Sequence, residues 1–393
     1  MVNYVPSGQN FDTTLQAIQA KVFEGSRLTP EEGLFLYEKA ELPFVGMLAN
    51  RVRERKHGDK TYFNRNFHIE PTNVCLYTCS FCSYSRLIKK REEGWEYSFE
   101  EIMEQFMAYD GKPVTEVHIV GGVLPQYDLE FYCKLFKAMK THRPQIHIKA
   151  LTPVEYHYIF KKAKLSYEDG LKVIIEAGVD SMPGGGAEIF DESIRSQIAG
   201  GKCSSSEWLS MHELWHQLGK KSNATILYGH METYAHRVDH LNRLRELQDR
   251  TKGFQAFIPL KFRNKNNQMS HLEELSLIED LRNYSISRIF LDNFDHIKAY
   301  WPMLGRHNAQ LALSFGVDDM DGTIDDSTKI YSMAGSEELN PSLTTQELVQ
   351  LILQVGRRAV ERDSLYEELR EYTHHDLDMK NGVRFYQLPV IPT

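Results

Sequence analysis

The sequence has few cysteines and no long apolar run. Five cysteines occur among 393 residues, and an odd number with three of them inside eight positions argues against a disulfide framework. The formal net charge is -8 and no long basic stretch is present, so we expect no nucleic-acid partner. No stretch approaches the ~20 apolar residues that span a bilayer, and residues 1–19 lack an apolar signal core. We therefore expect a cytoplasmic protein without a membrane partner.

Strand-like and helical segments alternate through most of the chain. Hydrophobic residues make up 41% of the sequence, which is enough for a sizeable core. The predicted strands cover residues 61–69, 115–120, 145–151, 179–182, 224–229, 254–262, 286–292 and 310–315. Strands that alternate with helices form a parallel sheet, and eight such repeats predict a closed (β/α)8 barrel of the TIM type.

Helices are predicted from their start signals. A Ser or Thr followed three residues later by Glu is typical of a helix N-terminus. The sequence has five such pairs, which are Thr29/Glu32, Ser98/Glu101, Thr152/Glu155, Ser204/Glu207 and Thr344/Glu347. We predict an α/β protein with a helical extension over residues 1–56 and a barrel over residues 57–330. Residues 331–393 are predicted to form a C-terminal helix and a tail packed on the barrel.

Unusual residues follow the ends of successive predicted strands. The three clustered cysteines follow the first strand, Gly121-Gly122 the second, Thr152 the third, Gly184-Gly185-Gly186 the fourth and Gly229-His230-Met231-Glu232 the fifth. Active sites of such barrels lie at the C-terminal ends of the strands. The sequence therefore predicts one active site at this face.

The cysteine segment has metal-ligand spacing. Cys75, Cys79 and Cys82 form a C-x3-C-x2-C motif, and three thiolates on one loop suit three corners of a [4Fe–4S] cluster. No fourth cysteine is near, so one iron stays open to a further ligand. A structural zinc site normally has four protein ligands, and His68 is the candidate fourth ligand for that alternative.

The cysteine motif and its place in the chain resemble the radical S-adenosylmethionine (SAM) superfamily. The resemblance implies that SAM binds the open iron and that Phe81 packs near its adenine. It also implies that Gly121-Gly122 bind the SAM amino group through backbone carbonyls. The chain departs from the pattern at Val123, where the superfamily has a glutamate. Further residues that we expect to bind SAM are Thr152, Glu188, Tyr228 and His230.

Five further segments resemble one branch of that superfamily, which contains the futalosine-pathway enzymes of menaquinone synthesis and the deazaflavin synthases. The segments are residues 68–73, 181–189, 228–233, 257–260 and 316–323. The similarity is greatest to the aminofutalosine synthases. It implies that the adenosyl radical from SAM adds to 3-[(1-carboxyvinyl)oxy]benzoate, and that rearrangement and decarboxylation follow. The alternatives within the branch are hydrogen-abstracting enzymes, namely the cyclic dehypoxanthinylfutalosine synthases and the deazaflavin synthase subunits.

The implied substrate is a dianion with two carboxylates, which arginine and histidine side chains suit. Arg195 and Arg263 are our candidate carboxylate ligands, and Arg86 and Arg237 also adjoin barrel loops. The alternative for each arginine is a solvated surface side chain. His68 is the candidate acid–base or hydrogen-bonding group, with a core histidine as the alternative.

Two non-enzymatic alternatives follow from the cysteines alone. An electron carrier would normally close its cluster with four cysteines and would not need a barrel of this size. A structural zinc module is the other alternative. For the enzyme, a flavodoxin or ferredoxin is the expected electron donor. Cys133 lies on an apolar helix face and is expected to pack in the core, whereas Cys203 has no predicted role.

Overall fold

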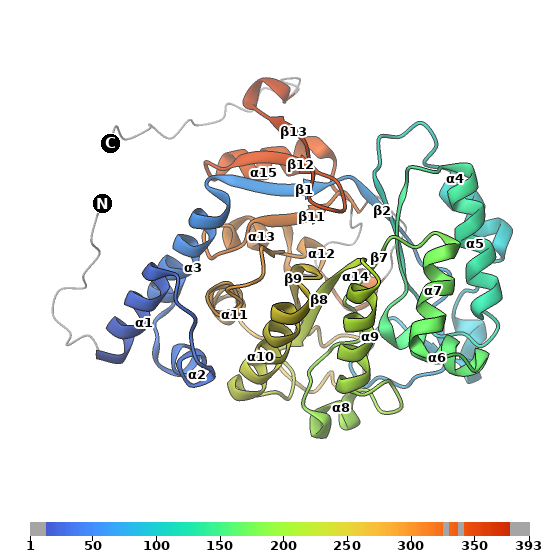
Figure 1. Cartoon of the computed structure of the whole chain (residues 1–393), viewed down its shortest axis with the longest axis horizontal. Helices are drawn as coiled ribbons and strands as arrows, with labels where there is room; N and C mark the ends of the chain where they lie inside the picture. The colour runs from blue at the N-terminus through green and yellow to red at the C-terminus, as the bar shows by residue number, and fades with distance from the viewer. Residues whose placement is uncertain (1–12, 325–329, 337–341, 378–393) are drawn as a thin grey trace.

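The protein is described by a computed structural model that covers residues 13–324, 330–336 and 342–377. Its centre is a parallel sheet that curls into a barrel surrounded by helices (Figure 1). The strands of the barrel are β1 (Lys60–Asn64), β2 (Asn66–Ile69), β5 (Glu116–Ile119), β6 (His147–Ala150), β7 (Ser181–Met182), β8 (Lys221–Tyr228), β9 (Phe254–Lys261), β10 (His296–Ile297) and β11 (Asp319–Gly322).

The barrel closes through β11. Strands β2, β5, β6, β7, β8, β9 and β10 are hydrogen-bonded in that order, and all of the pairs are parallel. A parallel bridge joins Lys298 after β10 to Asp319 in β11, and β11 pairs with β1. Since β1 and β2 are one strand interrupted at Arg65, the described residues form a ring of eight strand positions, as the sequence predicted.

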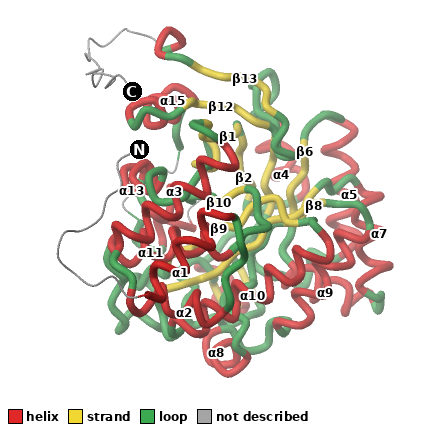
Figure 2. Tube along the Cα trace, turned by 60° about the vertical axis from the view of Figure 1, so that its left-hand side comes forward, coloured by secondary structure: helices red, strands yellow, loops and turns green. Residues whose placement is uncertain are grey.

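Helices cover the outside of the barrel (Figures 1 and 2). They are α4 (Phe99–Met107), α5 (Leu129–His142), α6 (Pro153–Ala163), α7 (Tyr167–Ala177), α8 (Glu192–Ile198), α9 (Ser205–Gln217), α10 (Tyr234–Thr251), α11 (Leu277–Phe290), α12 (Trp301–Leu304) and α13 (Arg306–Ala312). The predicted capping boxes begin α4, α6 and α9, and also α2 (Pro30–Lys39) and α15 (Thr345–Gln354), so all five predicted helix starts are confirmed.

Both ends of the described chain add elements to the barrel. Helices α1 (Thr13–Glu24), α2 (Pro30–Lys39) and α3 (Leu42–His57) form the N-terminal part, in which α2 contacts α10 and α3 contacts α11. The C-terminal part contains α14 (Ile330–Met333), α15 (Thr345–Gln354), β12 (Arg358–Arg362), β13 (Glu368–Tyr372) and the short helix His374–Asp376. β12 pairs with β1, an extension of the sheet that we did not predict. The predicted boundaries at residues 56 and 330 stay predictions, and residues 1–12 and 378–393 lie outside the described residues.

Two predicted strands were wrong. Residues 286–290 belong to α11, and residues 310–312 belong to α13. α11 is buried on nearly all of its faces from Leu281 to Phe290. Its sequence therefore lacks the apolar periodicity of a helix and resembles the pattern of a buried strand. The strands that occupy these positions of the barrel are β10 and β11. Both are short, and β11 carries Asp319 and Asp321, so they lack an apolar signal.

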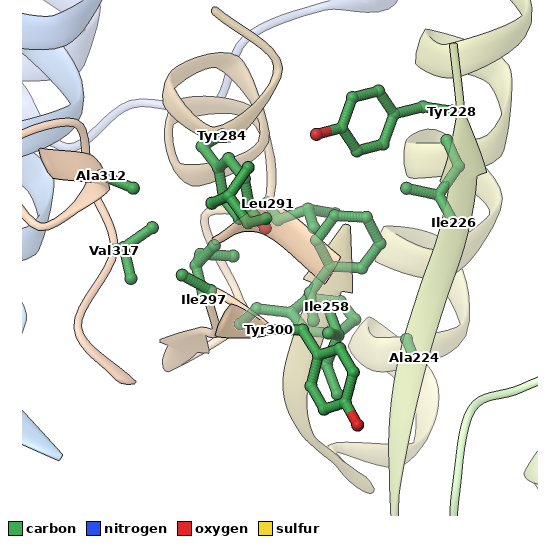
Figure 3. Close-up of a cluster of buried hydrophobic side chains, with 14 of the residues drawn as sticks. Ala224, Ile226, Tyr228, Ile258, Tyr284, Leu291, Ile297, Tyr300, Ala312 and Val317 are labelled. Atoms are coloured by element: carbon green, nitrogen blue, oxygen red, sulfur yellow. The ribbon is translucent and has the colours of Figure 1, made fainter. Parts of the chain in front are cut away.

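One large apolar cluster packs the barrel strands against α10 and α11 and extends into the N-terminal and C-terminal helices. Figure 3 shows part of it, where side chains of β8 face side chains of α11 across β9. A second cluster packs β2, β5 and β6 against α4, α5, α6 and α7. In the part of the chain that the structure describes, no helix is both long and apolar enough to cross a membrane.

Candidate active site

The three clustered cysteines lie on one loop at the end of the barrel. Cys75 ends the short strand β3 (Val74–Cys75), which pairs with β4 (Arg86–Leu87), and Cys79 and Cys82 lie between these strands. Backbone N–H groups of Tyr77 and Val123 donate to the sulfur of Cys75 at 3.4 and 3.3 Å. Hydrogen bonds of this kind to cysteine sulfur help to set the reduction potential of an iron–sulfur cluster.

The three cysteines share one pocket and are not among the closely grouped candidate metal ligands of the described residues. All three cysteines line this pocket, which we call the cysteine pocket. Among the described residues, the only three candidate metal ligands whose atoms all lie within 4.8 Å are His57, His296 and Asp318, at the opposite end of the strands. A tetrahedral zinc ion would bring its thiolate sulfurs to about 3.8 Å from one another. A set of three thiolates without a fourth protein ligand fits a [4Fe–4S] cluster, in which each thiolate binds a different iron atom.

The other donors of the cysteine pocket also disfavour zinc. His68, the candidate fourth zinc ligand, lines a different cavity inside the barrel. No histidine or fourth cysteine is among the described residues that line the cysteine pocket. Burial raises the pKa of Cys75 and raises the pKa of Cys79 to about 11. Metal binding replaces the protons of such thiols, so the donor set fits an open-iron cluster held by three thiolates.

A charged pair and an aromatic ring form one wall of the cysteine pocket. Glu188 accepts a hydrogen bond from the Nζ atom of Lys202 at 2.8 Å, and the same ammonium lies 5.2 Å from the ring centre of Phe81. Glu188 has a φ of 48°, which is rare for a residue with a side chain and follows the glycine loop after β7. Phe81 and Glu188 were predicted at this site, whereas Lys202 was not.

The glycines after β5 pack against the chain that leads to Cys75. A Cβ atom on Gly122 would lie 2.2 Å from the carbonyl oxygen of Val74, and one on Gly121 would lie 2.8 Å from that of Thr72. The two glycines line the cysteine pocket, but close backbone packing is what requires them.

The buried carboxylate of Glu155 holds this glycine loop. It accepts hydrogen bonds from the backbone N–H groups of Gly121 at 3.2 Å and Thr152 at 2.6 Å. Burial raises the pKa of Glu155 to about 7, although both N–H groups favour its anion.

The second cavity lies inside the barrel and adjoins the cysteine pocket. Val120 and Thr152 line both spaces, so the two are neighbours at the ends of β5 and β6. We call this second space the barrel cavity. Its polar lining comes from five strands and the segment after β10, and includes Asn66, His68, Glu116, His118, Lys149, Asn223, Thr225, Lys298, Tyr300 and Asp321.

Two ion pairs and two histidines dominate the barrel cavity. The Nζ atom of Lys149 lies 2.7 Å from Glu116, and that of Lys298 lies 3.0 Å from Asp321. The rings of His68 and His118 meet edge to face, with centres 4.6 Å apart. Burial lowers the pKa of His68 to about 4 and lowers that of His118 well below its usual range. Both imidazoles are therefore neutral near pH 7.

The structure does not bring the predicted arginines to either cavity. Arg195 is buried and donates to the backbone carbonyls of Gly186, Ala187, Ile189 and Cys203, so it holds the glycine loop. Arg263 pairs with Glu274 at 2.9 Å. Arg86 donates to carbonyls of its own loop, and Arg237 pairs with Glu232 at 2.7 Å. None of these arginines is among the lining residues of the two cavities.

Tyr228 and His230 also lie outside the two cavities. The Tyr228 side chain points toward α11 (Figure 3), and its hydroxyl donates to Asp280 at 3.0 Å. The ring of His230 lies between the carbonyl of Leu227 at 3.0 Å and the carboxylate of Glu232 at 3.3 Å. Their predicted role in SAM binding stays a prediction, and the side chains have structural partners.

The charged groups of the barrel cavity are not among the predicted site residues, because the predictions placed the site in the loops that follow the strands. Glu116, Lys149 and Asp321 lie within strands, and Lys298 directly follows one. Glu116 and Lys149 nevertheless have a sequence signal, because each is the one Asp, Glu, Lys or Arg residue of a short strand, and interior positions of such barrels are normally apolar.

Comparison with known proteins defines the family. Residues 69–244 match the radical SAM superfamily, and residues 251–375 match the CofH/MqnC C-terminal region. The chain is 44% identical to an aminodeoxyfutalosine synthase of Thermus thermophilus, over 91% of this chain and 97% of that protein. It is 39% identical to one of Streptomyces coelicolor, over 91% and 95%. It is 37% identical to a cyclic dehypoxanthine futalosine synthase of S. coelicolor, over 90% and 89%.

Solved structures share the fold at low sequence identity. The [FeFe]-hydrogenase maturase HydG of Carboxydothermus hydrogenoformans has a TM-score of 0.71 at 16% identity, over 90% of this chain and 81% of that chain. Methylornithine synthase (PylB) has a TM-score of 0.64 at 18% identity, over 80% and 88%. The chain therefore belongs to the radical SAM superfamily of enzymes, and within it to the aminodeoxyfutalosine synthase family. Membership of this superfamily implies SAM, a [4Fe–4S] cluster and a small-molecule substrate.

Proposed function

We propose that the protein is an aminofutalosine synthase of menaquinone biosynthesis. It joins the 5′-deoxyadenosyl group of SAM to 3-[(1-carboxyvinyl)oxy]benzoate, and rearrangement with loss of a carboxylate gives 6-amino-6-deoxyfutalosine. SAM is thus consumed as a building block. The observation that carries the proposal is the similarity to two aminodeoxyfutalosine synthases over 91% of the chain.

In this proposal Cys75, Cys79 and Cys82 hold the [4Fe–4S] cluster. When bound, the cluster supplies the electron that cleaves the C5′–S bond of SAM. Phe81, Gly121, Gly122 and Glu188 line the pocket on which the three cysteines converge and are the groups that surround SAM. A flavodoxin or a ferredoxin delivers the electron.

The barrel cavity receives the enol-ether substrate. It shares Val120 and Thr152 with the cysteine pocket, so a SAM molecule bound beside the cysteines can present its adenosyl carbon to that cavity. Addition requires the alkene carbon at about 3–3.5 Å from C5′. The walls of the barrel limit access of water to the reacting atoms. Neutral His68 and His118 add hydrogen-bonding groups without charge.

A second candidate function is that of the cyclic dehypoxanthine futalosine synthases, which the 37% identity to one such enzyme favours. That chemistry uses the adenosyl radical to abstract hydrogen and releases 5′-deoxyadenosine. The two functions therefore differ in the fate of the adenosyl group.

The test is a turnover assay on the anaerobically reconstituted, dithionite-reduced enzyme. SAM and 3-[(1-carboxyvinyl)oxy]benzoate are supplied, and products are separated and weighed by mass spectrometry. We expect a product that contains both the purine and the benzoate ring. Turnover of dehypoxanthinylfutalosine, with no such product from the enol ether, would instead assign the second function.

A further inference from the structure

The barrel cavity contains charge where a barrel of this type is usually filled by apolar side chains. Lys149 and Glu116 form one ion pair, and Lys298 and Asp321 form the other. All four residues are nearly inaccessible to solvent, at 1–8% side-chain exposure for the first pair and 3–9% for the second. A buried ion pair is seldom more stabilising than an apolar replacement, so its presence is not explained by stability alone.

The sheet register places these groups side by side. His68 in β2, His118 in β5 and Lys149 in β6 are successive register partners, and Lys298 bridges to β11, which carries Asp321. The charges of Asp321 and Lys298 act on both His68 and Lys149, so the groups form one cluster. The cluster lines the same cavity as Thr152, which with Val120 also lines the cysteine pocket.

Each lysine has N–H donors that no hydrogen bond uses in the described structure. An ammonium group has three N–H donors. Within the described residues, the Lys149 ammonium donates once, to Glu116, and the Lys298 ammonium donates once, to Asp321. The buried Nε2 atom of His118 has no hydrogen-bond partner. These groups can therefore bind oxygen atoms of a ligand without losing their present partners.

The rest of the lining suits an aromatic carboxylate. Val120, Ile258 and Leu260 supply an apolar wall, and no arginine is among the described residues that line the cavity. With His68 and His118 neutral, Lys149 and Lys298 are the cations of this lining. Because Glu116 and Asp321 balance them, the cavity does not attract anions from a distance, and recognition depends on direct hydrogen bonds to the ammonium groups.

We propose that Lys149 and Lys298 each hold one carboxylate of the substrate and so fix the alkene carbon next to the adenosyl group. This inference rests on the proposed function, which supplies a substrate with two carboxylates. Each ammonium then lies between a protein carboxylate and a substrate carboxylate and donates to both. Glu116 and Asp321 act as positioning residues that hold the lysines extended into the cavity.

The test measures substrate binding to the holoenzyme in the presence of SAM and without reductant, so that no turnover occurs. Equilibrium dialysis with radiolabelled 3-[(1-carboxyvinyl)oxy]benzoate gives the Kd. Lys149→Gln and Lys298→Gln are each expected to raise the Kd by about tenfold or more, as the loss of a charged hydrogen bond predicts. Lys261→Gln is the matched control, since Lys261 forms a comparable buried pair with Asp280 at 2.7 Å outside the cavity. Its Kd should stay within about twofold of the wild type.

A double variant separates binding from folding. Lys149→Gln alone leaves Glu116 buried without its cation, which also destabilises the barrel. Glu116→Gln/Lys149→Gln restores neutrality, and its melting temperature should recover toward that of the wild type while the Kd stays high. Recovery of the wild-type Kd in the double variant would overturn the proposal, because the pair would then be only structural.

A substrate analogue tests the assignment of one carboxylate to each lysine. The phenyl analogue, which lacks the ring carboxylate, should bind one lysine variant as well as it binds the wild type. Equal further losses of affinity in both variants would overturn the assignment. If the wild-type enzyme forms no product with both purine and benzoate, the proposed function is disproved. If the product forms normally but the lysine variants have unchanged Kd values for the substrate, only this inference is disproved.

Discussion

The carboxylate of Glu155 accepts a hydrogen bond from the backbone N–H of Gly121, 34 positions earlier in the chain. Glu155 belongs to the first turn of α6, and Gly121 belongs to the loop that follows β5. The next residues of that loop donate to the carbonyl of Thr72 and to the sulfur of Cys75. One buried side chain thus connects a helix N-terminus to the support of the cysteine loop.

We expect Glu155→Gln to destabilise the protein by about 1–3 kcal/mol, because the amide can accept only one of the two backbone N–H bonds and a buried donor loses its partner. Chemical unfolding measures the effect. Glu207→Gln is the matched control, since Glu207 has the same capping-box position on α9 but is 41% exposed. Equal losses of stability in the two variants would contradict the linking role of Glu155.

We expect Gly122→Ala to lower both stability and iron content. The added methyl group would lie 2.2 Å from the Val74 carbonyl oxygen, so the segment that leads to Cys75 has to move. Overpacking of this kind costs about 1–3 kcal/mol. Gly200→Ala is the control, because its nearest contact would be the Ser196 carbonyl at 3.2 Å. Thermal unfolding and iron analysis of both variants are the measurements, and a Gly122→Ala protein with normal iron would contradict the expectation.

Alanine at Cys75, Cys79 or Cys82 should abolish assembly of the cluster. The anaerobically reconstituted wild type should contain about four iron and four sulfide per chain. Cys133→Ala should keep this content, since Cys133 lies on α5 outside the cysteine pocket. A full complement of iron and sulfide in the Cys79→Ala protein would refute the assignment of the ligands.

Buried neutral histidines should make the protein sensitive to acid. Burial lowers the pKa of His216 and that of His240 to about 3, from 6.5 in the unfolded chain. Between these values the unfolded chain binds more protons, so their stabilising contribution is complete above pH 6.5 and is lost as the pH falls toward 3. Each histidine adds a slope of up to about 1.4 kcal/mol per pH unit to the free energy of unfolding. Urea unfolding at a series of pH values should give a shallower slope for His240→Gln, and an unchanged slope would contradict the burial effect.

The barrel and the grouping of the three cysteines on one loop could be predicted because their signals are local. Cys75, Cys79 and Cys82 lie within eight positions, and a Ser or Thr three residues before Glu marks a helix start whatever it packs against. The last two barrel strands could not be located in this way. Apolar periodicity disappears in the fully buried α11, and charged residues interrupt the short β11.

The grouping of the cavity residues depends on partners that are distant in the chain, so it could not be predicted from the sequence. Lys149 and Lys298 are 149 positions apart, and only closure of the barrel brings both to one cavity. Arg195 looked suited to a carboxylate, but the carbonyls that its guanidinium binds converge only in the folded loop. The resemblance implied cationic ligands, but the sequence did not indicate which cationic residues line the cavity.

The fate of the adenosyl group distinguishes addition of the radical to the substrate from hydrogen abstraction. Reduced holoenzyme is given the enol-ether substrate and SAM labelled with ¹³C in its adenosyl carbons, and the products are followed by mass spectrometry. We predict label in a product that carries both the purine and the benzoate ring. Free labelled 5′-deoxyadenosine in an amount equal to an unlabelled substrate-derived product would contradict it.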